Sequence, residues 1–357
     1  MNSSCRINNI SVTLLKAVLN QPFRIATGQH DSLDNVLLTV ELEGGIKGFG
    51  EAAVATHITG ETIPQTVRNL NNFRKVLRRY PVSDYLTISG LAHAAMADNK
   101  AAVAAVEMAV LDALTRYLRM PLWRLWTDKP QSFKTDITIV IADLPETMAK
   151  TKEFYTAGFR AFKIKIGRDM DLDFKRVVAV ASIVKKSQII LDANQGFSAK
   201  QALSFLKQLE KAGVRVDLLE QPVPKADLEG LREVARKSKV CVCADESASS
   251  LPQVLQLIKD KSVGAINIKL MKTGLVHAVA IARWAQAQGV KLMIGGMMES
   301  NLAMTASAHV ATGIGGFDFI DLDTPFFIRG AVARNPFLSS RGQYDLSHAK
   351  LGIGINP

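Results

Sequence analysis

Seven ionisable residues stand at the ends of successive short apolar runs in the middle of the chain. They are Lys163, Lys165, Asp192, Glu220, Asp245, Lys269 and Asp321. Charged side chains at the C-terminal ends of buried strands are the way in which a β/α barrel presents a catalytic site. Three successive carboxylates flanked by lysines therefore predict a divalent metal ion with two bases beside it.

The carboxylates of Asp192, Glu220 and Asp245 follow consecutive predicted strands and should stand side by side at the barrel mouth. Hard oxygen ligands without histidine or cysteine favour magnesium or manganese over zinc. Asn194, two residues beyond Asp192, is expected to support the ligands or the substrate. Any one of these acids could instead cap a helix, as Asp and Asn often do. Three in succession, one of them a glutamate, favour the metal site.

The lysines are placed in the same way. Lys163 and Lys165 are two apart in one predicted strand and share a face, while Lys269 ends a strand across the barrel. Burial favours the neutral form of a lysine, and nearby metal and ammonium charges should lower its pKa further, toward that of a general base. The alternative is that these lysines form salt bridges with the acids for structure alone.

Two lysines on opposite sides of one substrate carbon have a specific use. One can remove a proton from one face, and the other can return a proton to the opposite face. A metal ion meanwhile holds the substrate carboxylate and stabilises the enediolate formed between the two steps. The pattern predicts racemisation or epimerisation by a 1,1-proton transfer.

The elements that must position these residues are also visible. From about residue 135, short β-branched runs alternate with helical patterns at intervals of about 26 residues, which favours a parallel (β/α) barrel over a doubly wound sheet. The preceding part has the pattern of a smaller α+β domain. We therefore predict an α/β fold, a modified TIM barrel. Its parts are a capping domain (1–125), the catalytic barrel (126–325) and a tail (326–357) that packs back on the capping domain.

The bulk composition argues against several other classes of protein. The chain has 357 residues, 48% of them hydrophobic and 22% charged, which is ordinary for a globular protein. The basic residues behind its net charge of +11 are scattered and not interleaved with aromatic residues, so no nucleic-acid partner is expected. No signal peptide or membrane-spanning run is evident, so we expect a cytoplasmic protein without a membrane partner. Three cysteines form neither a disulfide framework nor a zinc motif.

With these residues in view, the chain resembles the enolase superfamily in its muconate-lactonising branch, and within that branch the dipeptide epimerases. The resemblance covers essentially the whole length. It rests on Lys163-Ile164-Lys165, Leu191-Asp192-Ala193-Asn194, Glu220-Gln221-Pro222, Ala244-Asp245-Glu246-Ser247, Ile266-Asn267-Ile268-Lys269 and, in the first domain, Gly48-Phe49-Gly50-Glu51-Ala52. Together these motifs are specific for the superfamily.

The resemblance implies a magnesium-dependent epimerase that inverts the α-carbon of the C-terminal residue of an L-Ala-Xaa dipeptide. Lys165 and Lys269 would be the two bases, and Lys163 would meet the substrate carboxylate. The acids Asp192, Glu220 and Asp245 would bind one Mg²⁺ ion, for which Mn²⁺ is a substitute. By analogy with barrels of this size, a homo-oligomer is expected.

The same resemblance assigns residues to the dipeptide. Asp321 and Asp323 would hold its α-ammonium, since residues two apart on a strand face the same way and two carboxylates can bind one ammonium. The alternative is a strand-end acid followed by a turn aspartate. Four further positions match residues that contact the dipeptide backbone. They are Thr135, Gly296, Met297 and Met298.

One departure from the family bears on specificity. In relatives that act on L-Ala-Glu, a basic residue in the loop after Pro-Phe binds the glutamate side chain. Here Gly28 stands where that arginine is expected, and Arg24 comes earlier. The mobile loop of residues 22–34, with His57 and Ile58, should line the side-chain pocket. The glycine favours dipeptides with a neutral or apolar C-terminal residue.

Other functions of the same scaffold fit these residues less well. A cycloisomerase or an o-succinylbenzoate synthase would share the lysines and acids, but Asp321 and Asp323 would then have no task. Sugar-acid dehydratases use a late histidine base, whereas His277 and His309 fall in predicted helices. A barrel that only binds or scaffolds is disfavoured, because such a protein has no need to keep every member of the lysine and acid set.

Overall fold

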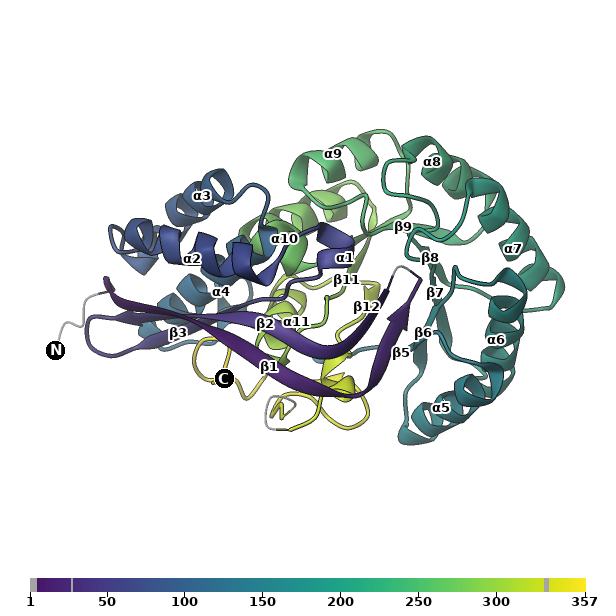
Figure 1. Cartoon of the computed structure of the whole chain (residues 1–357), viewed down its shortest axis with the longest axis horizontal. Helices are drawn as coiled ribbons and strands as arrows, with labels where there is room; N and C mark the ends of the chain where they lie inside the picture. Colours follow the sequence, from purple (N-terminus) through teal and green to yellow (C-terminus); the bar gives the residue numbers. More distant parts are fainter. Residues whose placement is uncertain (1–4, 27, 331–333) are drawn as a thin grey trace.

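The computed structural model describes residues 5–26, 28–330 and 334–357, and its first part is an antiparallel sheet covered by helices. The sheet has the order β1-β2-β3, with bounds Ile7–Ile25, Gly28–Leu42 and Lys47–Ala52. After the short α1 (Thr56–Thr59) follow α2 (Ile63–Leu77), α3 (Tyr85–Ala95) and α4 (Lys100–Tyr117). Figure 1 shows these helices on one side of the long β1–β2 ribbon.

Helix α4 joins the two halves of the molecule. It is buried from Ala101 to Thr115, because it lies between the first sheet and the barrel helix α10 (Leu270–Ala287). Glycines on β3 permit the close approach. A Cβ at Gly48 would lie 2.3 Å from the carbonyl oxygen of Ala109, and one at Gly50 would lie 2.0 Å from that of Ala105. A larger side chain at either position would push α4 off the sheet.

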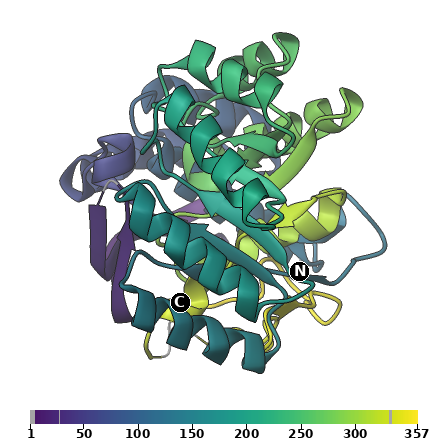
Figure 2. The same ribbon diagram turned by 90° about the vertical axis from the view of Figure 1, so that its right-hand side faces the viewer.

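The second part is a sheet of eight strands in chain order, and every neighbouring pair is parallel. The strands are β5 (Ile137–Ile139), β6 (Ala161–Lys165), β7 (Gln188–Asp192), β8 (Leu218–Glu220), β9 (Cys241–Ala244), β10 (Ala265–Ile268), β11 (Lys291–Ile294) and β12 (Phe319–Ile320). The helices between them are α5 (Leu144–Ala157), α6 (Met170–Ile183), α7 (Ala199–Lys211), α8 (Leu228–Lys237), α9 (Leu251–Lys259), α10 and α11 (Asn301–Ile314). Figure 1 and Figure 2 show α5, α6 and α7 outside the curved sheet.

The first and last strands of this sheet come together. The backbone N–H of Asp136, just before β5, donates a hydrogen bond to the carbonyl oxygen of Ile320 on β12 (2.8 Å). The predicted (β/α) barrel is thereby confirmed. A separate apolar cluster is formed by one buried residue from each of six consecutive strands: Ile190, Leu218, Cys243, Ala265, Met293 and Phe319. Cys243 is therefore a packing residue.

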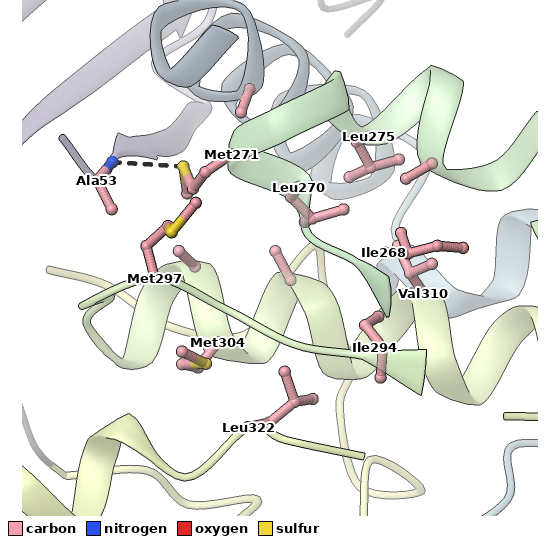
Figure 3. Packing of buried hydrophobic residues seen from close by; sticks show 14 of the residues in the cluster. Ala53, Ile268, Leu270, Met271, Leu275, Ile294, Met297, Met304, Val310 and Leu322 are labelled. Carbon is pink, nitrogen blue, oxygen red and sulfur yellow. Dashed lines mark hydrogen bonds between the residues drawn. The ribbon is translucent and has the colours of Figure 1, made fainter. Parts of the chain in front are cut away.

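The first domain and the barrel share one apolar core close to the strand ends. In Figure 3, Ala53 from the end of β3 faces Met271 at the start of α10, and Met297 lies beside them. The backbone N–H of Ala53 donates to the sulfur of Met271 at 3.3 Å. The segment after β3 is therefore held against the loops that follow β10 and β11, where the predicted site lies.

The C-terminal segment returns to both parts of the chain. Its strand β13 (Gln343–Tyr344) pairs with β4 (Phe133–Lys134) before the barrel. Further on, Ile353 N–H donates to a carboxylate oxygen of Asp112 on α4 (2.6 Å). Across the described ranges, no helix combines the length and the apolar character needed to cross a membrane.

One expectation is wrong. Of the predicted loop of residues 22–34, residues 22–25 belong to β1 and residues 28–34 to β2, with Phe23 opposite His30 and Arg24 opposite Gln29. Residue 27 lies outside the described residues. The ribbon extends this far because Ile25 and Leu33 are buried, and the N–H of Ile141 after β5 donates to the Arg24 carbonyl at 3.2 Å. In Figure 1 the end of β1 lies beside the barrel, near β5.

Candidate active site at the barrel mouth

The predicted acids and lysines meet where the central strands end. The parallel register places Lys165 beside Asp192 and Asp192 beside Glu220. Glu220 lies beside Cys243, so Asp245 is two residues beyond it on β9's continuation. All of these side chains are buried. The structure therefore brings the three predicted acids together on neighbouring strands.

Lys163 contacts three of the acids at the barrel mouth. Its ammonium lies 3.0 Å from Asp192 Oδ2, 2.7 Å from Glu220 Oε2 and 2.7 Å from Asp321 Oδ2. One lysine thus faces three carboxylates and joins the predicted metal ligands to the predicted ammonium site. Only 1% of Lys163 is exposed, so these contacts are shielded from water.

The two predicted bases lie on opposite sides of the acids. Lys165 on β6 donates to Asp192 Oδ2 (2.6 Å) and to Asn194 Oδ1 (3.2 Å). Lys269, which follows β10, donates to Asp245 Oδ2 (2.7 Å). Strands β7, β8 and β9 separate the two lysines in the sheet. A group bound between them would present one face to each ammonium.

Two further residues of the site were not predicted from the sequence. Lys272, in the first turn of α10, donates to Asp245 Oδ1 (2.6 Å) and to the carbonyl oxygens of Asp245 and Asn267. Asn267 donates its amide to Glu220 Oε1 (2.7 Å). Asn267 lies two residues before Lys269 on the same face of the strand, and Lys272 lies three residues after it in the first turn of α10. For Asn267, the strand face that it shares with Lys269 was the available signal.

The acids respond differently to burial. Burial would raise the pKa of the Asp192 carboxyl, but Lys165 and Lys163 outweigh it and hold the pKa below its ordinary value. Asp245 is held low in the same way by Lys269 and Lys272. For Glu220, burial and the negative charge of Asp192 prevail and raise the pKa. The ionised form of Glu220 is therefore less favoured than those of Asp192 and Asp245.

The expected lowering of the lysine pKa values is not seen at Lys269. Burial alone would lower the pKa of its ammonium, but the carboxylates of Asp245 and Glu220 outweigh burial and raise it above its ordinary value. The pKa is raised because carboxylates paired with an ammonium group stabilise its charged form.

The acids fit a hard divalent cation by their chemistry. They offer only oxygen donors and they end adjacent strands, and a further cation would favour the ionised form of Glu220, whose pKa is raised by burial and by Asp192. Their oxygens are each drawn toward a lysine or an amide in this arrangement. Within the described residues, the acidic oxygens that converge within 4.8 Å of one another belong to a different group, Asp136, Asp321 and Asp323.

This second acidic group is the predicted ammonium site with one addition. Asp321 and Asp323 follow the end of β12, so their convergence comes from the turn after the strand and not from the strand face. Asp323 Oδ2 accepts a hydrogen bond from the N–H of Thr138 (2.6 Å). Asp136 was missed because it precedes the first barrel strand, whereas the predicted acids follow the apolar runs of their strands.

A small cavity of about 50 Å³ lies over the lysines and this acidic group. Asn194, Gly296, Met297 and Met298 line it, as do Lys163, Lys165, Lys269, Asp321 and Asp323. Thr135 lies outside this lining, and its hydroxyl is bonded to the backbone of Ile320 and Leu322. Thr138 stands at the cavity in its place. Ligand pockets usually exceed roughly 300 Å³, so binding requires the covering side chains to move.

The β1–β2 ribbon covers the cavity with apolar and neutral groups. Phe23, Ile25 and His30 of the ribbon line it together with Ile58. The His30 ring lies 4.6 Å from the His57 ring, and burial, His57 and Lys165 lower the pKa of His30 to about 4. His30 is therefore neutral at pH 7. Its place in the cavity lining was not predicted from the sequence.

The remaining specificity residues lie at the edge. Arg24 does not line the cavity and donates to the Gln29 side chain instead (3.1 Å). A Cβ at Gly28 would lie 3.0 Å from the ring of His57. The histidine thus fills the space beside the glycine, and no cation of the ribbon lines the cavity among the described residues.

Known families match both parts of the chain. Residues 9–126 match the N-terminal domain of the mandelate racemase / muconate lactonizing enzyme family, and residues 146–357 match the enolase C-terminal domain-like family. Together these ranges leave only short segments unmatched. The match therefore extends over the cap as well as the barrel.

Individual relatives are similar along their whole length. The hydrophobic dipeptide epimerase of Citrifermentans bemidjiense is 49% identical, over 100% of this chain and 99% of that protein. The aromatic dipeptide epimerase of Herpetosiphon aurantiacus is 37% identical over 94% of each chain. A solved dipeptide epimerase of Enterococcus faecalis V583, complexed with Mg and the dipeptide L-Leu-L-Tyr, superposes with a TM-score of 0.92 at 31% identity, covering 98% and 99% of the two chains.

Proposed function

Because the chain belongs to the mandelate racemase / muconate lactonizing enzyme family of the enolase superfamily, we propose that its barrel mouth epimerises dipeptides by means of two lysines. The protein is an isomerase, a dipeptide epimerase, as are its relatives of 49% and 37% identity. The observation that carries the proposal is the placement of Lys165 and Lys269 on opposite sides of one row of buried acids.

Magnesium is the cofactor, and Asp192, Glu220 and Asp245 are the residues that would hold it. When bound, Mg²⁺ polarises the substrate carboxylate and stabilises the charge that develops at the α-carbon. Lys163 lies 2.7 Å from Glu220 Oε2 and supplies a second positive charge for the same carboxylate. Lys272 and Asn267 hold Asp245 and Glu220 in place from behind.

The lysines move the proton. With the dipeptide between them, the neutral form of one lysine removes the α-proton at its Nζ, and the ammonium of the other returns a proton to the opposite face. The roles exchange when the other epimer reacts. For this, a lysine must first lose its proton, and it does so more easily once its carboxylate partner, such as Asp245 for Lys269, no longer neutralises it.

The remainder of the cavity selects the dipeptide. Asp321 and Asp323 would bind its α-ammonium, and Gly296 and the two methionines after it would lie along its backbone. The side chain of the C-terminal residue would enter beneath Phe23, Ile25 and Ile58. With neutral His30, and with no cation among the described ribbon residues that line the cavity, this lining supports hydrophobic side chains and disfavours glutamate.

Deuterium uptake tests the proposal. The protein with Mg²⁺ in heavy water should incorporate one deuterium at the second residue of L-Ala-L-Xaa dipeptides, most rapidly when Xaa is apolar. A Lys165→Met/Lys269→Met double variant is the matched control and should give none. Absence of uptake from every dipeptide by the magnesium-loaded wild type would reject the epimerase and favour a cycloisomerase or synthase.

A further inference from the structure

We propose that Asp136 is a positioning residue of the ammonium site. It lies outside the cavity lining, against Asp321 and Asp323, and makes the enzyme select dipeptides with a free, charged amino group. The inference rests on the proposed function and deepens it. Asp136 does not line the cavity. It would therefore act through Asp321 and Asp323, which do.

Asp136 is a buried acid that has neither a hydrogen bond nor an ion pair to its carboxylate among the described residues. It is 1% exposed, and its backbone is fixed by the hydrogen bond to Ile320. Among the residues that the structure describes, neither of its carboxylate oxygens accepts a hydrogen bond, and no lysine or arginine lies within ion-pair distance. A buried carboxylate in this state costs free energy unless a cation arrives or a proton is bound.

The neighbours of Asp136 increase the need for a cation. An oxygen of Asp136 lies within 4.8 Å of oxygens of both Asp321 and Asp323. Lys163 is the nearby ammonium, yet it also serves Asp192 and Glu220. Burial and the charges of Asp321 and Asp323 accordingly raise the pKa of Asp136. The three carboxylates therefore lack enough positive charge nearby, and a substrate cation can supply it.

An ammonium group fits these three carboxylates better than a metal ion does. One oxygen of Asp321 is already bound by Lys163 and one of Asp323 by the N–H of Thr138. Mg²⁺ demands near-octahedral oxygen coordination, whereas an ammonium needs only a few acceptor oxygens for its three N–H donors. A neutral group in the same place would leave the carboxyls uncompensated. Asp136 thereby strengthens discrimination against dipeptides whose amino group is blocked or missing.

The test compares two substrates in two proteins. L-Ala-L-Leu and propanoyl-L-leucine differ only in the α-ammonium, and deuterium uptake measures kcat/KM for each. Wild type should prefer the dipeptide strongly. Asp136→Asn should reduce that preference about tenfold or more through a higher KM for the dipeptide, while uptake by propanoyl-L-leucine stays the same or increases. Asp323→Asn serves as a comparison that should show the same pattern.

Other outcomes would overturn the inference. An equal loss for both substrates in Asp136→Asn would reduce the residue to a structural role, and an unchanged preference would remove it from the ammonium site. A second equivalent of Mg²⁺ in wild type that Asp136→Asn abolishes would assign the acids to a metal. If neither Asp136→Asn nor Asp136→Ser folds, as judged by circular dichroism, Asp136 is needed for the barrel itself and the inference is rejected. Lack of uptake by wild type rejects the epimerase itself, and this inference with it.

Discussion

Lys272 donates a hydrogen bond to Asp245 Oδ1 at 2.6 Å and leaves the other carboxylate oxygen to Lys269. The same ammonium also binds the backbone carbonyls of Asp245 and Asn267. Lys272 therefore ties the end of β9 to the end of β10, and both the metal ligand and the base depend on it. It is 3% exposed, so water cannot replace these bonds.

Lys272→Met should therefore destabilise the protein. It removes one partner of a buried ion pair, a loss that costs about 3–5 kcal/mol in other proteins. Denaturant unfolding would measure the change. Lys239→Met is a matched control, because Lys239 pairs with Glu210 on the surface (2.9 Å) and its loss should leave the unfolding midpoint where it is. An unchanged midpoint for Lys272→Met would contradict the role given to it.

Lys269→Ala should separate the two halves of the reaction. With Lys165 alone, epimerisation should fall roughly 10²–10⁴-fold, while exchange of the α-proton continues for the single epimer that faces Lys165. Mass spectrometry and chiral chromatography of the dipeptide in heavy water would distinguish the two effects. Retention of full activity on both epimers would show that the mechanism does not use two bases.

The site could be predicted from the sequence where strands end, and less well elsewhere. Lys165, Asp192 and Glu220 are adjacent in space because the parallel register carries each strand end beside the next, so alternation of short apolar runs was enough to place them. Lys272 looks like any lysine of an amphipathic helix. Its burial depends on the first turn of α10 packing over β9 and β10, which periodicity does not report.

The pairing of β1 and β2 over the cavity could not be predicted from the sequence for another reason. Residues 29–34 are mostly polar and resemble a loop, yet they pair with the end of β1 because Phe23 and Ile25 turn toward the barrel. That pairing is decided by contacts between distant parts of the chain. The same holds for Asp136, whose neighbours Asp321 and Asp323 are brought to it by closure of the barrel.

Magnesium should stabilise the folded protein. A ligand that binds only the folded state at a hundred times its Kd contributes about 2.7 kcal/mol, which would raise the melting temperature by several degrees. Thermal unfolding with EDTA or with Mg²⁺ would measure this. The rise should vanish in Glu220→Gln, which removes a proposed ligand. A metal-independent melting temperature in wild type would contradict binding at these acids.

His309 should make stability depend on pH. Burial lowers its pKa from 6.5 to about 4, and the hydrogen bond with the carbonyl oxygen of Ile353 (3.0 Å) offsets only part of this effect. The other ring nitrogen accepts a hydrogen bond from the N–H of Trp123 at 3.0 Å. The unfolded chain therefore binds more protons between pH 6.5 and 4, and this contribution, about 3 kcal/mol, is lost as pH falls through that window. His309→Gln should flatten the fall in melting temperature. An identical pH profile in the variant would assign the effect to other groups.

A cation at position 28 should change the selectivity of the side-chain pocket. A Cβ at Gly28 would lie 3.0 Å from the His57 ring, and that ring is exposed enough to turn away. Gly28→Arg should bring a cation to the tip of the ribbon beside neutral His30, and so raise kcat/KM for L-Ala-L-Glu relative to L-Ala-L-Leu about tenfold. Gly28→Ala displaces the same ring without adding charge, and its ratio should stay near that of wild type. Equal ratios for the Arg and Ala variants would mean that selectivity comes from shape alone, set by Phe23, Ile25 and Ile58.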